Sequence, residues 1–139
     1  HNDLEEGEVR EYATPQEMLD DFGIKGQLIP AEVPEEFGAP TCWASNDESG
    51  LKLENLYESQ GNYLYFRYKQ ISKESTMSIE KDSRSAIYWD CADIYHYQMT
   101  DNGIEKITWI NGDFECRASS NVTGEELRQI VESIYEGEK

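Results

Sequence analysis

His96 is the one histidine away from the start of the chain, and it is the first residue to consider for catalysis. A nucleophilic pair would need a thiol or hydroxyl within hydrogen-bond reach of its imidazole. Asp93 is the nearest acid, but Cys91 lies beyond an expected bend, and no nucleophile motif surrounds either residue. We therefore interpret His96 as an exposed strand histidine and expect no catalytic residue in this chain.

The three cysteines, Cys42, Cys91 and Cys116, contain no Cys-x-x-Cys pair. A structural zinc site takes four cysteine or histidine ligands, usually in closely spaced pairs, so we expect no metal and no cofactor. An odd number of cysteines permits at most one disulfide. We expect buried free thiols instead, because cysteine is among the residues most often buried.

Carboxylates are so frequent that adjacent pairs carry little chemical information. Glu35–Glu36 and Glu125–Glu126 could do acid–base work, but 29 acidic residues make such neighbours expected by chance. The second pair also has a structural role, because it complements a helix N-terminus. Asn46–Glu48 and Asp101–Gly103 could supply calcium ligands, yet neither completes a calcium-binding loop, and we interpret both as turns.

The aromatic surplus offers the one candidate binding surface. In one expected strand the even positions are apolar, and the odd positions are Tyr63, Tyr65 and Arg67. If the even positions face a core, these three side chains share the other face, and Tyr88 has the same parity relative to its apolar neighbours. Tyr63, Tyr65, Arg67 and Tyr88 are therefore candidate ligand-binding residues that could stack on a sugar or clamp a peptide. The alternative is that an N-terminal helix or residues 30–37 cover them.

Length and charge limit the classes of protein to which this chain can belong. Its 139 residues and 16.0 kDa suit one domain. The formal net charge of −17 argues against a nucleic-acid partner and against docking on anionic lipid through a basic face. With 37% apolar residues the chain can still form a core. No apolar run approaches a membrane span, so we expect membrane contact only through an anchor outside this chain.

The N-terminal part of the sequence predicts a tail and a short helix. Residues 1–13 are acidic and weakly patterned, which is typical of a tail or linker before a single α+β domain over residues 14–139. Thr14–Glu17 matches a helix start with a cap and a first-turn proline, and Gly23 is a plausible stop. Two prolines within residues 28–37 then favour an extended edge segment, because proline lacks an amide donor.

From Leu51 onward the apolar period is two, which is typical of strands. Gly61–Asn62 is suited to a hairpin turn, and centring the turn there places Tyr57 opposite Phe66. That pairing gathers the apolar residues of both strands on one face. Thr76–Ile79 is a further short strand candidate.

The strongest local signal is the hairpin around Asn111–Gly112, a preferred turn dipeptide. Counting outward pairs Trp109 with Phe114 on a dry face and Lys106 with Arg117 on a wet face. A slip of one residue would turn the aromatic side chains to water, so the assignment of faces is well specified.

Residues 85–100 predict a longer strand with a bend at residues 90–92. Its odd-numbered positions are mostly apolar or aromatic, which indicates one shared face. These positions are Ile87, Trp89, Tyr95, Tyr97 and Met99.

A second helix is predicted at the end of the chain. Thr123–Glu126 matches a capping box, and an apolar stripe follows it at helical spacing. The stripe consists of Leu127, Ile130, Val131 and Ile134. It needs an apolar partner, and the Trp109 hairpin is the nearest in sequence. Consecutive strands between two helices indicate an α+β fold with a single antiparallel, meander-like, curved sheet, a short N-terminal helix and a C-terminal amphipathic helix packed on the sheet.

Several motifs together resemble a family of bacterial extracytoplasmic domains of unknown function (DUF four-three-six-seven). They are a proline-rich opening, an aromatic strand, a tryptophan hairpin, a helix start and a helix end, at Pro30–Phe37, Tyr63–Tyr68, Trp109–Phe114, Ser119–Leu127 and Ile130–Ile134. The chain departs from the family in having Val33 and Glu36 where leucine and glycine are usual. The resemblance implies the C-terminal domain of a membrane-anchored Gram-positive protein, with no established catalytic residues.

We therefore expect a non-enzymatic extracytoplasmic sensor or interaction domain at the cell surface, membrane-anchored in the full-length protein, that binds an unknown protein, peptide or glycan. The alternative is a carrier-like or scaffold domain that holds an apolar ligand in the curved sheet. That alternative predicts a cavity lined by Trp89, Tyr95, Tyr97 and Trp109. A small hydrolase has the least support, because no nucleophile–base pair is visible.

Overall fold

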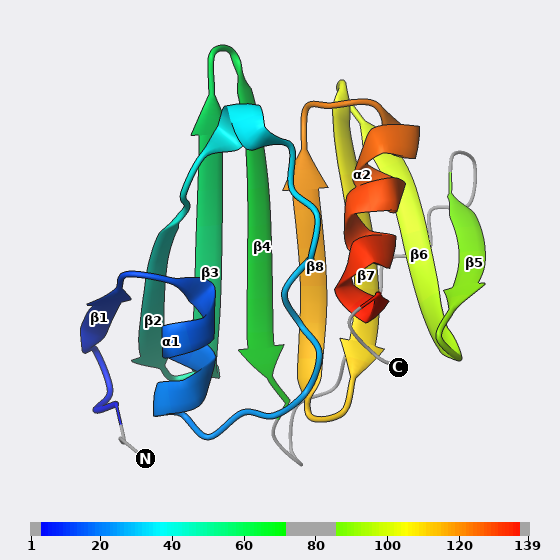
Figure 1. The fold of residues 1–139 in the computed structure, drawn as a ribbon. Helices are drawn as coiled ribbons and strands as arrows, with labels where there is room; N and C mark the ends of the chain where they lie inside the picture. Colours follow the sequence, from blue (N-terminus) through cyan, green and yellow to red (C-terminus); the bar gives the residue numbers. More distant parts are fainter. Residues whose placement is uncertain (1–3, 72–85, 137–139) are drawn as a thin grey trace.

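The computed structural model describes residues 4–71 and 86–136. Its main element is an eight-stranded antiparallel sheet in the order β1-β2-β3-β4-β8-β7-β6-β5 (Figure 1). The strands are β1 (Val9–Tyr12), β2 (Thr41–Asp47), β3 (Gly50–Ser59), β4 (Asn62–Gln70), β5 (Ile87–Cys91), β6 (Ile94–Asp101), β7 (Ile104–Asn111) and β8 (Phe114–Ser120). The helices are α1 (Pro15–Asp21) and α2 (Gly124–Glu132), with the 3-10 turns η1 (Glu35–Phe37) and η2 (Ser133–Tyr135).

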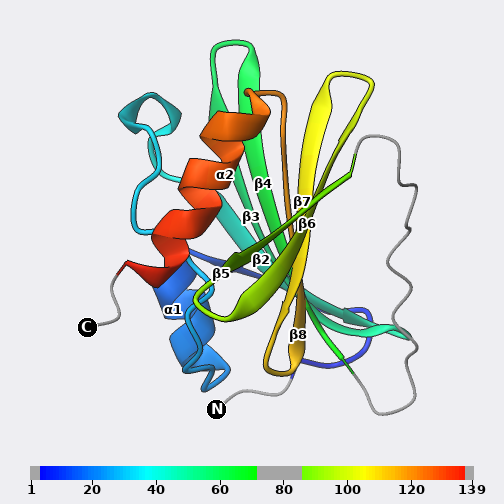
Figure 2. The same cartoon turned by 90° about the vertical axis from the view of Figure 1, so that its right-hand side faces the viewer.

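The sheet consists of two four-stranded meanders that lie side by side. Strands β1 to β4 are neighbours in sequence order, as are β5 to β8, and the two halves meet where β4 pairs with β8. The strands twist strongly across the sheet, as Figure 2 shows. The expected α+β class, with a single antiparallel sheet and a C-terminal helix, is confirmed.

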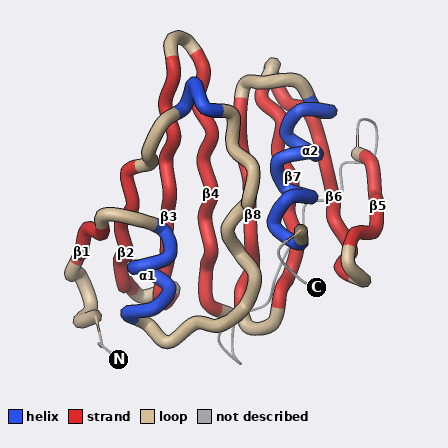
Figure 3. The backbone as a smooth tube through the Cα atoms, in the orientation of Figure 1, coloured by secondary structure: helices blue, strands red, loops and turns tan. Residues whose placement is uncertain are grey.

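Both helices lie on the same face of the sheet, which we call the helical face (Figure 3). The chain between α1 and β2 crosses this face as well (Figure 1). We call the opposite side the second face, and no described helix lies on it (Figure 2). Side chains alternate between the two faces along a strand. The strand positions that face the helices therefore also determine which positions lie on the second face.

α2 contacts the sheet through the apolar stripe that the sequence predicts. Thr123 Oγ1 accepts a hydrogen bond from the amide of Glu126 at 3.2 Å, as a capping box requires. All four stripe residues are buried: Leu127, Ile130, Val131 and Ile134. The helix packs on β7 and β8, where Trp109 is only 1% exposed. The predicted packing of the last helix on the tryptophan hairpin is confirmed.

The expected N-terminal tail contributes a strand. Residues 9–12 form β1 at one edge of the sheet and pair with β2, from Val9 opposite Ser45 to Tyr12 opposite Cys42. A four-residue edge strand carries too little apolar alternation to stand out in the sequence. α1 begins as predicted, because Thr14 Oγ1 accepts a hydrogen bond from the Glu17 amide at 3.1 Å.

The expected extended edge segment around Pro30 and Pro34 was wrong. Residues 28–37 form no strand, cross the helical face and end in η1, with Pro30 and Phe37 buried. The segment is tied to the end of α2, where the Glu32 amide donates to Ser133 Oγ at 3.1 Å. Burying its apolar side chains on the sheet is more favourable than pairing at a sheet edge, because the two prolines lack the amide donors that strand pairing needs.

Both predicted hairpins exist, but each register differs from the prediction by two residues. Tyr57 pairs with Leu64 rather than Phe66, and Trp109 pairs with Cys116 rather than Phe114. The faces survive because a shift of two preserves parity. Asn111 lies in the strand, since its side chain donates to the carbonyl of Gln27 at 2.8 Å, and the turn moves to the next two residues.

The bend predicted at residues 90–92 is a two-residue hairpin turn at Ala92–Asp93. Both turn residues have positive φ, 53° and 63°, which matches the twist of a tight hairpin. Trp89 therefore pairs with His96, and odd positions of β5 share a face with even positions of β6. The expected common face was wrong: Tyr95, Tyr97 and Met99 lie on the second face, away from Trp89.

The remaining expectations concern thiols and unassigned segments. Cys42 and Cys116 are buried and free, as predicted, and Cys91 is free and half-buried. The strand candidate Thr76–Ile79 lies outside the described residues. Within the described residues, no helix is long and apolar enough to cross a bilayer.

The packing of α2 predicts a large loss of stability for Leu127→Ala. Removing a fully buried leucine from a close-packed core costs about 2–5 kcal/mol of the free energy of unfolding. Urea unfolding measures this loss. Ile110→Ala is the control, since Ile110 is next to Trp109 in sequence but 39% exposed, and its loss should be about 1 kcal/mol or less. Equal losses in the two variants would show that α2 does not form the core.

Candidate functional site

The four candidate binding residues all lie on the second face. Tyr63, Tyr65 and Arg67 alternate along β4 with the buried residues of the helical face, and Tyr88 has the same position relative to Trp89 on β5. Tyr63 and Tyr65 are half-buried, and Tyr88 is 43% exposed. The alternative, that α1 or residues 30–37 cover them, was wrong, because both segments lie across the helical face.

A single transverse row of the sheet connects two of these residues. In the register of the strands, Arg67 is opposite Arg117, Arg117 opposite Thr108, Thr108 opposite Tyr97, and Tyr97 opposite Tyr88. Four strand spacings separate the ends of this row, which corresponds to about 19 Å. Thr108 and Tyr97, in the middle of the row, are only 8% and 4% exposed, so the accessible candidates lie at its two ends rather than in one compact site.

The far end of the row is a cluster of tyrosines. Tyr88 stacks on Tyr95 with ring centroids 5.6 Å apart and contacts Tyr97 at 5.0 Å. Tyr95 is 64% exposed, the largest fraction among the exposed large apolar side chains of the described residues. The sequence analysis did not place Tyr95 and Tyr97 here, because it assumed that odd-numbered residues stay on one face across the Ala92–Asp93 turn.

The near end of the row is cationic. Arg67 Nη2 lies 3.5 Å from Glu115 Oε1, and Arg117 makes no ion pair with a described residue. Tyr65 donates its hydroxyl to Glu54 Oε2 at 3.0 Å, and burial together with this carboxylate raises the pKa of Tyr65 to about 12. Arg117 is thus a site residue that sequence reasoning did not select, although the wet face of the predicted hairpin already contained it.

His96 is buried, so its interpretation as an exposed strand residue was wrong. Its ring is 0% exposed and stacks on Trp89 at 4.3 Å, with Trp109 at 5.3 Å. The prediction failed because the two-residue turn places even positions of β6 on the helical face. An imidazole in this position is a packing residue of the core.

Hydrogen bonds fix the tautomer of His96. Nδ1 lies 2.9 Å from the carbonyl of Ile94 and must donate to it, which leaves Nε2 to accept from the Tyr135 hydroxyl at 3.0 Å. Burial lowers the pKa of His96, and nearby Arg128 acts in the same direction. Asp90, Glu132 and the Ile94 carbonyl oppose this shift without reversing it.

The thiols are equally poor candidates for chemistry. Burial raises the pKa of Cys42 to about 11, and it also raises the pKa of Cys91 and of Cys116. A thiol with a raised pKa carries little thiolate at neutral pH, and the thiolate is the nucleophile. Within the described residues, no group of three or more metal-ligating side chains comes together.

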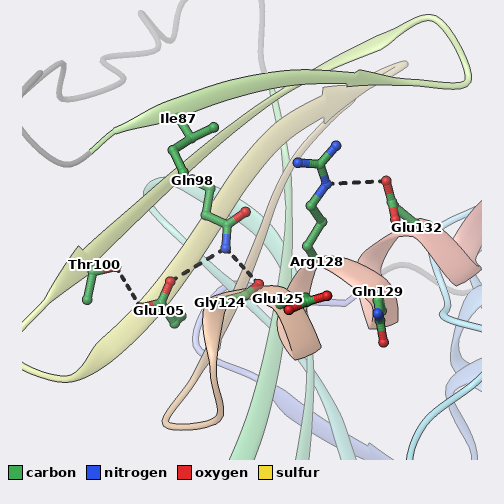
Figure 4. A pocket seen from close by; sticks show the side chains of 9 residues that line it. All are labelled: Ile87, Gln98, Thr100, Glu105, Gly124, Glu125, Arg128, Gln129 and Glu132. Carbon is green, nitrogen blue, oxygen red and sulfur yellow. Dashed lines mark hydrogen bonds and ion pairs between the residues drawn. The ribbon is translucent and has the colours of Figure 1, made fainter.

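The helical face contains a pocket of ≈ 730 Å³ between α2 and strands β5 to β7 (Figure 4). Its walls carry three carboxylates, Glu105, Glu125 and Glu132, and one guanidinium, Arg128. Arg128 donates from Nε to Glu132 Oε2 at 3.3 Å and lies over the Trp89 ring at 4.4 Å. The guanidinium of Arg128 therefore already has partners within the fold.

Gln98 occupies the floor of this pocket with all its polar atoms paired. Its Nε2 donates to the carbonyl of Gly124 at 2.9 Å, and its Oε1 accepts from Trp89 Nε1 at 3.1 Å. A Cβ on Gly124 would lie 2.7 Å from Glu105 Oε1, so a larger residue at this helix start would require the Glu105 side chain to move. The pocket is thus built by contacts that attach α2 to β6 and β7.

Comparisons with protein-family descriptions, with curated proteins and with solved structures found no match for this chain. The geometry of the second face is therefore the main basis for a functional proposal.

The lowered pKa of His96 predicts a loss of stability on acidification. The unfolded chain binds a proton near pH 6.5 while the folded chain resists it, so the free energy of unfolding falls as pH drops through and below 6.5. His96→Phe keeps an aromatic ring and removes the titrating group. Urea unfolding at pH 7.5 and 5.5 should show a smaller fall for the variant than for the wild type, whereas parallel profiles would contradict the assignment.

The Gln98 contacts predict a stability loss for Gln98→Leu. The buried indole N–H of Trp89 would lose its partner, which costs about 1–3 kcal/mol, and the part-buried carbonyl of Gly124 would lose its side-chain donor. Gln129→Leu, on the exposed rim of the same pocket, is the matched control and should change stability by less than about 0.5 kcal/mol. Thermal unfolding of both variants distinguishes them.

Proposed function

We propose that this chain is a non-enzymatic interaction domain that binds a partner through the second face of its sheet. The observation that carries the proposal is the composition of the transverse row, with arginines at one end and stacked tyrosines at the other. Arginine and tyrosine are enriched at protein interfaces, because both bury a large contact area and still offer hydrogen bonds.

The opposite face is already used by the fold. α1, α2 and residues 28–37 pack there, and its aromatic residues, including Trp109 and Phe66, are buried. A partner that contacts the second face displaces none of these elements. This arrangement supports a binding surface on the second face.

A non-enzymatic role is supported by the state of the reactive groups. His96 contacts two indole rings, and its unprotonated nitrogen, Nε2, accepts a hydrogen bond from the Tyr135 hydroxyl. The raised pKa values of the thiols disfavour nucleophilic cysteine. These features make a hydrolase the weakest of the three hypotheses.

We further propose an extracytoplasmic location at the cell surface, with membrane anchoring through a segment outside this chain. The support is the resemblance to the bacterial domain family (DUF four-three-six-seven), whose members lie outside the membrane of Gram-positive bacteria. In such a setting the domain would sense a peptide, glycan or protein and pass its bound state to the anchor.

The carrier-like alternative loses the cavity that it predicts. Trp89 and Trp109 lie under α2, and Tyr95 and Tyr97 lie on the second face. Residues on opposite faces of a sheet cannot line one cavity. No other observation favours an apolar ligand over a surface partner.

Site-specific photo-crosslinking tests the proposed face. A photoreactive phenylalanine analogue at position 65 or 88 should form adducts in the envelope fraction of a Gram-positive bacterium. The same analogue at position 129, exposed on the helical face, is the control and should form none. Adducts from position 129 alone, or equal adducts from all three positions, would contradict the proposal.

A further inference from the structure

We infer that the partner presents an acidic polypeptide segment, which the paired arginines Arg67 and Arg117 hold by their guanidinium groups. The inference rests on the proposed function, because it names the chemistry of the surface that the second face binds. It follows from the distribution of charge, from hydrogen-bond donors without acceptors and from the shape of the face.

Charge is segregated on this molecule. The chain has 29 acidic and 12 basic residues, yet the second-face positions of the central strands β4, β8 and β7 reverse this ratio. Their cations are Arg67, Lys69, Lys106 and Arg117, and their one carboxylate is Glu115, while the neighbouring strand β3 adds Lys52, Glu54 and Glu58 on this face. A cationic surface on so acidic a chain is complementary to an anion.

The two arginines lie directly opposite each other on β4 and β8. Like charges in this position destabilise a sheet, and within the described residues only Arg67 of the two has an ion pair. Glu115 is opposite Lys69 in the register and makes a long ion pair with Arg67, at 3.5 Å. The Nε atoms of Arg67 and Arg117 are buried with no hydrogen-bond partner.

A nearby carboxylate does not supply the missing acceptor. Register places Glu54 opposite Arg67 on β3, but its Oε2 accepts the hydroxyl of Tyr65 at 3.0 Å. Within the part of the chain that the structure describes, Arg117 has no carboxylate partner, and because its Nε is buried, only its terminal nitrogens could meet a partner. A guanidinium matches a carboxylate through two parallel hydrogen bonds, and such pairs are about twice as strong as neutral ones.

The shape of the face favours a polypeptide over a small anion. The pockets beside α1, α2 and the Asn111 turn are lined by residues of the helical face and the sheet ends. None of these four pockets includes a member of the transverse row. The row spans about 19 Å, the length of about six extended residues. A segment of that length reaches from Arg117 to the tyrosines at Tyr88 and Tyr95.

The acidic remainder of the chain does not prevent this contact. At physiological ionic strength, charges on the surface are screened beyond about 8 Å. A bound carboxylate therefore responds mainly to the nearest charges, which are the two arginines together with Glu54 and Glu115 beside Arg67. The net charge of −17 slows the approach of an acidic partner without cancelling the local attraction.

Selection from a displayed library of random dodecapeptides tests the inference, with three purified targets. These are the wild type, the double variant Arg67→Gln/Arg117→Gln, and Arg128→Gln, which removes one positive charge from the helical face. We expect acidic peptides from the wild type and from Arg128→Gln, and loss of that enrichment on the double variant. Fluorescence anisotropy with a selected synthetic peptide should give about tenfold or more weaker binding to the double variant.

Each other outcome decides the matter. Enriched peptides without an acidic excess, or acidic peptides that bind the double variant equally well, overturn the inference. If neutral peptides bind and Tyr88→Ser abolishes their binding, the proposed face survives and only its charge preference fails. Absence of enrichment overturns the inference, and absence of adducts at positions 65 and 88 separately overturns the proposed function. A dimer in sedimentation that the double variant dissociates would make a second copy the occupant.

Should the double variant fail to fold, as judged by its thermal unfolding, Arg67→Lys/Arg117→Lys replaces it. Lysine keeps both charges and removes the planar pair of donors, so the selected acidic peptide should bind more weakly than to the wild type. Unchanged affinity would show that the guanidinium groups do not hold the carboxylates.

Discussion

The contact between the apolar stripe of α2 and the tryptophan-bearing strands β7 and β8 determines the rest of the molecule. Leu127 and Val131 are fully buried against a sheet in which Trp109 is 1% exposed. Because side chains alternate along every strand, burying these positions assigns each neighbouring position to the second face. The surface proposed to bind a partner is thus the complement of the core, and its arginines and tyrosines occupy positions that the core leaves free.

Local patterns in the sequence predict which residues share a face, and they predict where helices begin. The caps at Thr14 and Thr123 depend on a few neighbouring residues, and both were confirmed. The predicted registers were wrong by two residues, because a turn dipeptide does not show whether the residue beside the glycine belongs to the turn or to the strand. Tertiary contacts, such as that of Asn111 with Gln27, determine this. The β4–β8 pairing joins residues about 50 positions apart and has no local signal.

The sequence predicted the part of the candidate site that depends on local patterns. Tyr63, Tyr65, Arg67 and Tyr88 were selected by parity within single strands, and parity places them correctly on the second face. The site also contains Arg117, Tyr95 and Tyr97. The position of Arg117 depends on which strand pairs with β4, and the positions of the two tyrosines depend on the turn at Ala92–Asp93. Alternation within a single strand predicts neither. The same turn moved His96 into the core, where it stacks on Trp89 and accepts a hydrogen bond from Tyr135, and where burial lowers its pKa.

Fluorescence quenching of Trp109 tests the central contact most directly. In the double variant Trp43→Phe/Trp89→Phe, Trp109 is the remaining tryptophan, and its indole is covered by the stripe of α2. Acrylamide should quench its emission weakly in the folded protein and strongly after unfolding in urea. Strong quenching in the folded state, with a cooperative unfolding transition still present, would place Trp109 in solvent and contradict both the helical face and the second face derived from it.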